Sequence, residues 1–160
     1  MKLVPVGKSH SAFVDDADYA RISLYRWHPV NGYARTWVIG RDGKRHSLRM
    51  HRLIMDPPDH LEVDHWDRNR LNNVRSNLRV CTHAQNSRNG GGVKSTSKFK
   101  GVSLSGDSFR KKPWKCEIRV GGKKIYLGRY SSEAEAAAAY DIAAEEHFGQ
   151  FAFLNASFVY

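Results

Sequence analysis

A short stretch poor in apolar residues divides this chain and limits the folds open to it. Residues 88–98 read RNGGGVKSTSK, which contains three consecutive glycines and two serines. Segments of this composition connect folded units rather than form part of a packed core. The 160 residues are therefore expected to form two small domains. We place the first at residues 1–90, the linker at 91–97 and the second at 98–160.

The first domain is expected to mix short strands and helices. Asp15 or Asp16 would cap a helix over DADYARISLYR. Alternating apolar residues predict a hairpin of 33–40 and 44–50 with its turn at Asp42-Gly43. A short helix over 50–55 must stop before Pro57-Pro58. Two strands, LEVDH and NLRVC, then precede a helix over THAQNSRN with Thr82 as its N-cap.

The second domain shows a simpler pattern of three strands followed by one helix. The strands are FKGVSLS, PWKCEIRV and KKIYLGRY, and Gly121-Gly122 favours a tight turn between the last two. Ser131 or Ser132 would cap a helix whose first turn carries Glu133 and Glu135. The fold class is therefore α+β. The expected buried face of the helix consists of Ala134, Ala137, Tyr140, Ala144 and Phe148.

The charge balance points to a polyanionic partner. The chain has 26 Lys and Arg against 16 Asp and Glu, a net charge of +10. Nucleic acid is the first candidate, and solubility alone is the alternative explanation. No apolar run of membrane-spanning length or signal-peptide core is present, so no membrane partner is expected. Cys81 and Cys116 lie in different halves and should not pair, which suits a reducing cytoplasm.

Residues 63–86 concentrate side chains that can perform hydrolysis with a metal ion. Asp64 offers a hard oxygen ligand, and His65 beside it offers a base whose ordinary pKa is about 6.5. Asn77 and Asn86 follow at intervals of twelve and nine residues. The order strand, loop, strand, helix is expected to bring Asp64 and His65 close to Asn86.

This block resembles the HNH nucleases, in particular the phage and intron type with Asn in place of the final His. The resemblance rests on the Asp-His pair, the Asn-Leu-Arg run and the final Asn. It implies a ββα-metal fold, with one Mg²⁺ or Mn²⁺ held by Asp64 and Asn86. His65 would be the general base, and Asn77 would hold its loop and orient its ring. Upstream, His51 also matches the family, and its role stays open between packing, phosphate contact and catalysis.

Residues 98–155 resemble the AP-two/ethylene-response-factor DNA-binding domain of plants. FKGV, Trp114 with Ile118 and Arg119, YLGRY and EAEAAAAYD carry the resemblance. It implies that the three-stranded sheet lies in the major groove of DNA. Ser103 and Ser105 stand where plant members have arginines, so the plant target sequence should not transfer. The residues that would face DNA are Lys100, Glu117, Arg119, Lys124 and Tyr126.

Together these features predict a homing-type endonuclease that hydrolyses phosphodiester bonds of double-stranded DNA. It would act as a monomer or weak dimer in a bacterial or phage-infected cell, without a small-molecule cofactor. One active site per chain favours nicking. A non-catalytic DNA-binding regulator derived from such a nuclease is the alternative. An RNA-acting nuclease is disfavoured, because the major groove of RNA is too narrow for a sheet.

Overall fold

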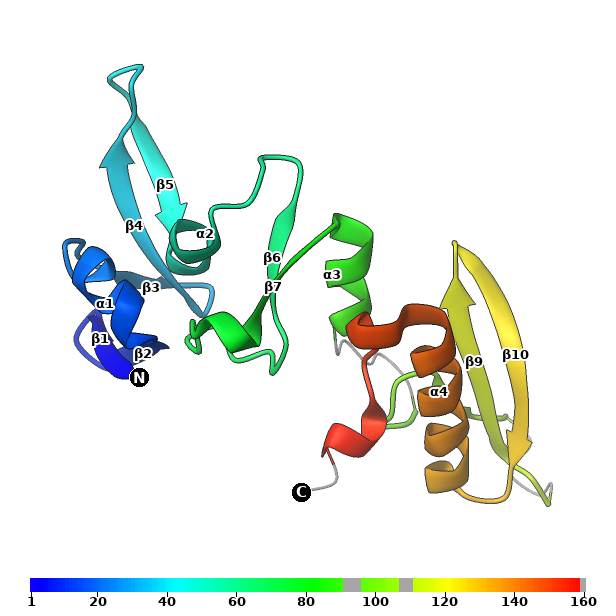
Figure 1. Cartoon of the computed structure of the whole chain (residues 1–160). Coiled ribbons are helices and arrows are strands. Elements are labelled where there is room, and N and C mark those ends of the chain that lie inside the picture. The colour runs from blue at the N-terminus through cyan, green and yellow to red at the C-terminus, as the bar shows by residue number, and fades with distance from the viewer. Residues whose placement is uncertain (91–95, 107–110, 159–160) are drawn as a thin grey trace. The chain divides into compact units, whose positions relative to one another are not determined.

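Residues 1–90, 96–106 and 111–158 are described by the structure, which is a computed structural model. Two compact units are present, Met1–Asn86 and Ser87–Tyr160 (Figure 1). Both combine helices with small antiparallel sheets, so the predicted α+β class is confirmed. No helix within the described ranges is both long enough and apolar enough to span a membrane.

The first unit contains three small sheets, β1-β2, β3-β4-β5 and β6-β7. Helices α1 and α2 pack with these sheets around one core, which includes Val6, Trp27 and Met50. The strands are β1 (Lys2–Val6), β2 (His10–Val14), β3 (His28–Val30), β4 (Tyr33–Ile39), β5 (Arg45–Arg49), β6 (Glu62–His65) and β7 (Leu78–Cys81). The helices are α1 (Asp16–Ile22), α2 (Met50–Met55), the 3₁₀ turn η1 (Arg75–Asn77) and α3 (His83–Asn89), which crosses into the second unit.

Most predicted elements of this unit are present. The β4–β5 hairpin turns at Asp42-Gly43, where Gly43 has a positive φ of 72°. Helix α2 ends at Met55, two residues before the prolines. Helix α3 follows Thr82, whose Oγ1 accepts a hydrogen bond from the Gln85 amide at 3.3 Å. The sequence therefore predicted the type and order of these elements correctly.

Helix α1 differs from the prediction at both ends. It stops at Ile22 rather than continuing to residue 26, and Asp15 occupies the N-cap position without a side-chain capping bond. The Asp15 carboxylate instead accepts a 2.7 Å hydrogen bond from the Arg75 amide. Arg75 also binds buried Asp18, through Nε to Oδ2 at 2.7 Å and Nη2 to Oδ1 at 2.9 Å. These tertiary bonds join α1 to η1, and they give Arg75 a structural role.

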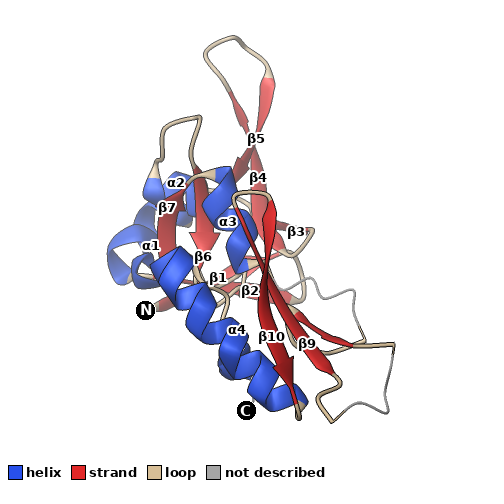
Figure 2. Ribbon diagram, turned by 90° about the vertical axis from the view of Figure 1, so that its right-hand side faces the viewer, coloured by secondary structure: helices blue, strands red, loops and turns tan. Residues whose placement is uncertain are grey.

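The second unit is a three-stranded sheet covered on one face by a long helix (Figure 2). The sheet order is β10-β9-β8, and Gly121-Gly122 connects β9 to β10 as predicted. The Ser132 hydroxyl accepts a 3.1 Å bond from the Glu135 amide, which confirms Ser132 as the helix cap. The elements are β8 (Val102–Leu104), β9 (Trp114–Val120), β10 (Lys123–Tyr130), α4 (Glu133–Phe148) and the 3₁₀ turns η2 (Gly149–Phe151) and η3 (Asn155–Phe158).

The buried face of α4 is offset from the predicted one. Ala134 is exposed, whereas Ala136 and Ala143 are buried beside Ala137, Tyr140 and Ala144. These buried positions still follow helical spacing. The prediction was wrong at Ala134 because a run of alanines contains no contrast that fixes which of them faces the sheet.

Candidate active site

The β6–β7 hairpin places Asp64 and His65 on opposite sides of one strand. Side chains alternate along a strand, and cross-strand partners share a face. Val63 and His65 therefore lie on the side of Leu78, in register with the core of the unit. Asp64 lies on the other side with its partner Arg79. The predicted ligand and the predicted base are thus neighbours at the end of β6 with different surroundings.

Asp64 is a buried carboxylate that binds an arginine. Arg79 donates to Asp64 Oδ2 through Nε at 2.8 Å and Nη2 at 2.6 Å. The Asp64 side chain is 7% exposed and that of Arg79 is 13% exposed. A carboxylate removed from water in this way needs a positive partner to remain ionised. Arg79 was within the motif that we recognised, but its pairing with Asp64 was not predicted.

Helix α3 brings Asn86 to the face of β6 that carries Asp64. The Asn86 amide donates through Nδ2 to Glu62 Oε2. Glu62 stands two residues before Asp64 on the same strand face, a separation of about 7 Å along the strand. His83 of the same helix is exposed, and its Nδ1 lies 2.8 Å from Glu62 Oε1. These two contacts hold the pKa of Glu62 below its usual range, with the Asn86 bond as the main cause.

His65 is surrounded by aromatic rings. Its side chain is 4% exposed, and the His51 ring from α2 lies edge-on at 5.0 Å between centroids. The Tyr33 ring of β4 lies 5.2 Å from His51 and 6.0 Å from His65. Burial lowers the pKa of His51 to about 3, so His51 packs as a neutral ring. Of the three roles left open for His51, its buried position and ring contacts favour packing.

A residue that the sequence did not single out fixes the protonation of His65. Asn73 is 1% exposed, and its Oδ1 lies 3.3 Å from His65 Nε2. Asn73 Nδ2 donates to the Arg70 carbonyl at 3.4 Å, so the amide oxygen is the end that faces the ring. An amide oxygen can only accept a hydrogen bond, so this contact favours the tautomer of His65 with its proton on Nε2. Neutral His65 then has its basic lone pair on Nδ1.

Burial also favours the neutral form of His65. Desolvation is the largest influence and lowers its pKa below the usual 6.5. The Asn73 hydrogen bond and the carboxylates of Asp67 and Asp64 act in the opposite direction. His65 is therefore available as a proton acceptor at neutral pH. The signal for Asn73 in the sequence was only the repeated Asn-Asn at 72–73.

Asn77 fastens the loop that follows His65. Its Nδ2 donates to Asp67 Oδ1 at 2.9 Å and to the Asn72 carbonyl at 2.8 Å. Its Oδ1 accepts from the Asp67 amide at 3.0 Å. The expected support of the loop therefore has a clear geometric basis. The ring of His65, however, is oriented by Asn73 rather than by direct contact with Asn77.

The oxygen donors on the α3 side of β6 suit a hard divalent cation. Asp64 supplies a carboxylate, and the Asn86 amide oxygen can take a cation because its nitrogen already binds Glu62. Among the described residues, no group of three or more His, Cys, Asp and Glu side chains forms a ready-made metal site. Asp64 and Asn86 are the residues on this face that could hold an ion, and water and phosphate would have to supply its other ligands.

The residues predicted to face DNA in the second unit mostly share one surface. Arg119 lies opposite Lys124, and Glu117 lies opposite Tyr126, on the face of the sheet away from α4. We define these four residues as the outer sheet face. Lys100 lies apart from them, because its ammonium donates to the Arg88 and Gly90 carbonyls at 2.6 and 2.7 Å.

Both cysteines are buried and free, as expected from their positions in different halves. Desolvation raises the pKa of the Cys81 and Cys116 thiols to about 11. They behave as small apolar residues and contribute no nucleophile.

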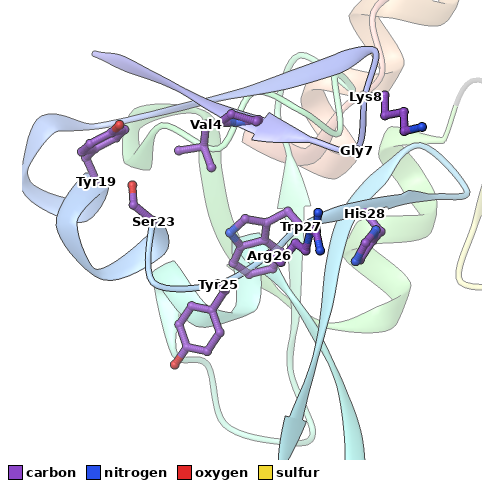
Figure 3. Close-up of a pocket in the computed structure, with 10 residues that line it drawn as sticks. Val4, Gly7, Lys8, Tyr19, Ser23, Tyr25, Arg26, Trp27 and His28 are labelled. Atoms are coloured by element: carbon purple, nitrogen blue, oxygen red, sulfur yellow. The ribbon is translucent and has the colours of Figure 1, made fainter.

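A separate cavity of about 610 Å³ lies in the first unit (Figure 3). Its lining includes Trp27 and Tyr25 on one side and the cationic side chains of Lys8 and Arg26. None of the predicted site residues lines it. The cavity is therefore distinct from the site around Asp64 and His65.

Comparisons with known proteins identify the family. A family model described as HNH endonuclease matches residues 56–88, the segment that holds Asp64, His65, Asn77 and Asn86. An uncharacterized HNH endonuclease of Acanthamoeba polyphaga mimivirus is 34% identical over 157 residues, covering 93% of this chain and 76% of the relative. The similarity thus includes both units. The chain belongs to the HNH endonuclease family.

Proposed function

We propose that this protein is a divalent-metal-dependent endonuclease that hydrolyses phosphodiester bonds of double-stranded DNA. The observation that carries the proposal is the buried His65 ring, which contacts Asn73 Oδ1 through Nε2 and follows the acidic residue Asp64 in the chain. A regulator that only binds DNA requires neither the buried imidazole nor its Asn73 partner. Membership of the HNH endonuclease family supports the same class of activity.

In the proposed reaction His65 Nδ1 takes a proton from the attacking water, and the water oxygen attacks phosphorus. The bond to the 3′ oxygen breaks and that oxygen takes a proton from a solvent water, so the products carry a 5′-phosphate and a 3′-hydroxyl. Asn73 keeps the reactive nitrogen of His65 unprotonated before the reaction. Asn77 holds the following loop through Asp67, which limits movement of the base.

Asp64 and Asn86 would hold one Mg²⁺ or Mn²⁺ ion, and Glu62 would orient the Asn86 amide. A bound ion would stabilise negative charge on the phosphate and on the leaving 3′ oxygen. The scissile phosphate would lie at the end of β6, where Asp64 and His65 are adjacent. Because one chain has one such site, the expected product is a nick, and double-strand cleavage would require two chains.

The second unit is proposed to be an AP-two-like DNA-targeting unit. The outer sheet face supports this proposal, since Arg119, Lys124 and Tyr126 are exposed and the helix covers only the opposite face. Two cations and an aromatic ring on one open sheet are suited to contacts with phosphates and bases. Lys100 is not part of the outer sheet face, and its ammonium bonds to main-chain carbonyls. Arg119→Ala with Lys124→Ala should weaken DNA binding without changing the cleavage chemistry.

The test is cleavage of supercoiled plasmid with Mg²⁺ or Mn²⁺, alongside a chelator control and His65→Ala. Open circular product from the parent, lost in both controls, would support the nuclease and its base. Linear product would indicate paired active sites. Salt-sensitive binding of duplex DNA without cleavage of any long substrate would favour the regulator instead.

A further inference from the structure

The β4–β5 hairpin presents a surface that none of the proposed catalytic roles uses. Strand β3 pairs only with the first part of β4, so the hairpin continues outward as a two-stranded ribbon. Figures 1 and 2 both show it projecting beyond the other elements of the first unit. Beside Ile39, alternation along the strands places five cationic or aromatic side chains on one side of it. We define these as the ribbon face: Tyr33, Arg35, Trp37, Arg45 and Arg49.

The charge of this hairpin is not balanced internally. Residues 33–49 contain five Lys and Arg against one acidic residue, Asp42, a net charge of +4. Asp42 lies in the turn, where its carboxylate binds His46 at 2.8 Å and the Lys44 amide at 3.1 Å. Arg35 and Arg49 are directly opposite in the register. Like charges in that position destabilise a sheet, so a polyanion on this face would relieve a cost present in the free protein.

The guanidinium groups of the ribbon face are already positioned on aromatic rings. Arg35 and Arg45 lie 4.4 and 5.3 Å from the centroid of Trp37, which is 48% exposed. Arg49 lies 4.9 Å from the centroid of Tyr33. Stacking leaves the N–H edge of a guanidinium available for phosphate oxygens. Arg35 Nε is buried and has no hydrogen-bond partner within the described residues, so a phosphate would be bound through the terminal nitrogens of Arg35.

The inner end of the ribbon face lies beside the candidate active site. Tyr33, at its inner end, contacts both His51 and His65 through its ring. The seven residues of β4 extend about 20 Å from that point, which is the length of roughly six base pairs. A two-stranded β-ribbon fits the major groove of B-form DNA, and it does not fit that of RNA.

From this geometry we propose that the ribbon face binds duplex DNA in the major groove beside the scissile phosphate. The inference rests on the proposed function, because it assumes that the phosphate reaches His65. It adds a second DNA-binding surface within the catalytic unit itself. Arg35 and Arg49 would bind phosphates at the groove edge, and Trp37 would hold Arg35 in place.

The test measures binding of the full-length protein to a 30-base-pair duplex by fluorescence anisotropy, in a chelator so that no cleavage occurs. Arg35→Gln with Arg49→Gln removes two charges from the ribbon face. The matched control, Lys8→Gln with Arg26→Gln, removes two exposed charges beside the cavity of the same unit. The ribbon variant should raise Kd about tenfold or more, and it should reduce the slope of log Kd against log salt concentration by about two. The control should change Kd less than about threefold, since it removes only general charge.

A footprint of the wild-type protein provides a measurement that does not depend on any variant folding. On a duplex bound at a fixed site, hydroxyl-radical protection should extend about six base pairs to one side of the cleavage position, and the ribbon variant should lose that protection. Equal effects of the ribbon and control variants, or preference for single strands over duplex, would overturn the inference.

The two proposals can fail separately. Salt-sensitive binding that the ribbon variant loses, without cleavage by the wild type, would support the ribbon face and reject the nuclease. Cleavage and binding unchanged by the ribbon variant would support the nuclease and reject the ribbon face. Absence of duplex binding by the wild type would reject both.

Discussion

Replacing Asn73 by alanine tests whether the protonation of His65 is set by its amide partner. In the wild type Nε2 carries the proton because Asn73 Oδ1 accepts it at 3.3 Å. Without this acceptor, a buried N–H group would lose its partner, at a cost of about 1–3 kcal/mol. The ring can avoid that cost by moving the proton to Nδ1, where the proposed water must be activated. The population of the reactive form should therefore fall.

The same energy sets the size of the effect. A cost of about 1–3 kcal/mol corresponds to a rate reduced roughly 5- to 150-fold in single-turnover plasmid nicking. Asn73→Asp keeps an oxygen acceptor and should retain most of the rate at high pH. Its added carboxylate raises the pKa of His65, so its activity should decline at a higher pH than that of the wild type.

Asn69→Ala is a suitable control, because Asn69 is an exposed residue of the same loop that bonds to the Leu71 amide. Its rate should stay within about threefold of the wild type. If Asn73→Ala cleaves as fast as this control while remaining folded, the tautomer argument is incorrect. A loss that Asn73→Asp does not reverse at any pH would indicate a purely structural role for Asn73.

Three further predictions concern other parts of the chain. Asp18→Asn should destabilise the first unit by about 2 kcal/mol at pH 7, since it weakens the bonds to half-exposed Arg75. Arg75 is the main cause that lowers the pKa of Asp18. The difference in free energy of unfolding, measured by chemical denaturation, should therefore shrink as pH falls below 3.8 and through the folded-state pKa. Glu62→Gln should raise the Mg²⁺ concentration for half-maximal cleavage about tenfold but preserve the rate at saturating metal, since it weakens only the positioning of Asn86. An unchanged Mg²⁺ titration would exclude a role for Glu62 in positioning Asn86. Gly101→Ala should destabilise the second unit by more than about 2 kcal/mol in thermal unfolding. Gly101 has a φ of +77°, and an added Cβ would meet Tyr140 and come within 2.6 Å of the Glu117 carbonyl. A melting temperature equal to that of the wild type would contradict this prediction.

Local sequence signals predicted most of the elements but few of their contacts. Proline, glycine and capping residues act over a few positions, so the limits of α2, the turn at Gly43 and the Ser132 cap could be read directly. The early end of α1 could not be read, since it accompanies long-range bonds between Asp15, Asp18 and Arg75.

In the candidate site, too, short-range signals could be read from the sequence and long-range contacts could not. The motif singled out Asp64, His65, Asn77 and Asn86 as candidates because they lie within one short segment of the chain. It did not reveal Asn73 as the partner of the His65 ring, because the neighbouring Asn72 and Asn73 differ only in the direction that the loop gives them. Nor did it reveal the contribution of Tyr33, which reaches His65 from a strand more than thirty residues earlier.

The pairing of Asp64 with Arg79 determines how metal binding and stability should be linked. Arg79→Gln leaves a carboxylate that is only 7% exposed without its arginine, which should cost about 3 kcal/mol in metal-free buffer. A divalent cation at Asp64 would replace the lost charge. Mg²⁺ at about ten times its Kd contributes roughly 1.4 kcal/mol to the folded state, so the melting temperature of this variant should rise by about 5–10 °C.

The wild type should respond to Mg²⁺ less than Arg79→Gln, because there the ion must compete with a guanidinium already bonded to Asp64 through Nε and Nη2. Arg21→Gln, which alters an arginine bound to Asp18 instead, should respond as the wild type does. Equal Mg²⁺ shifts in all three proteins would mean that the ion does not bind at Asp64. A larger shift in Arg79→Gln alone would mean that the ion and Arg79 compete for the Asp64 carboxylate, and it would explain how a site with only two protein ligands remains folded without its ion.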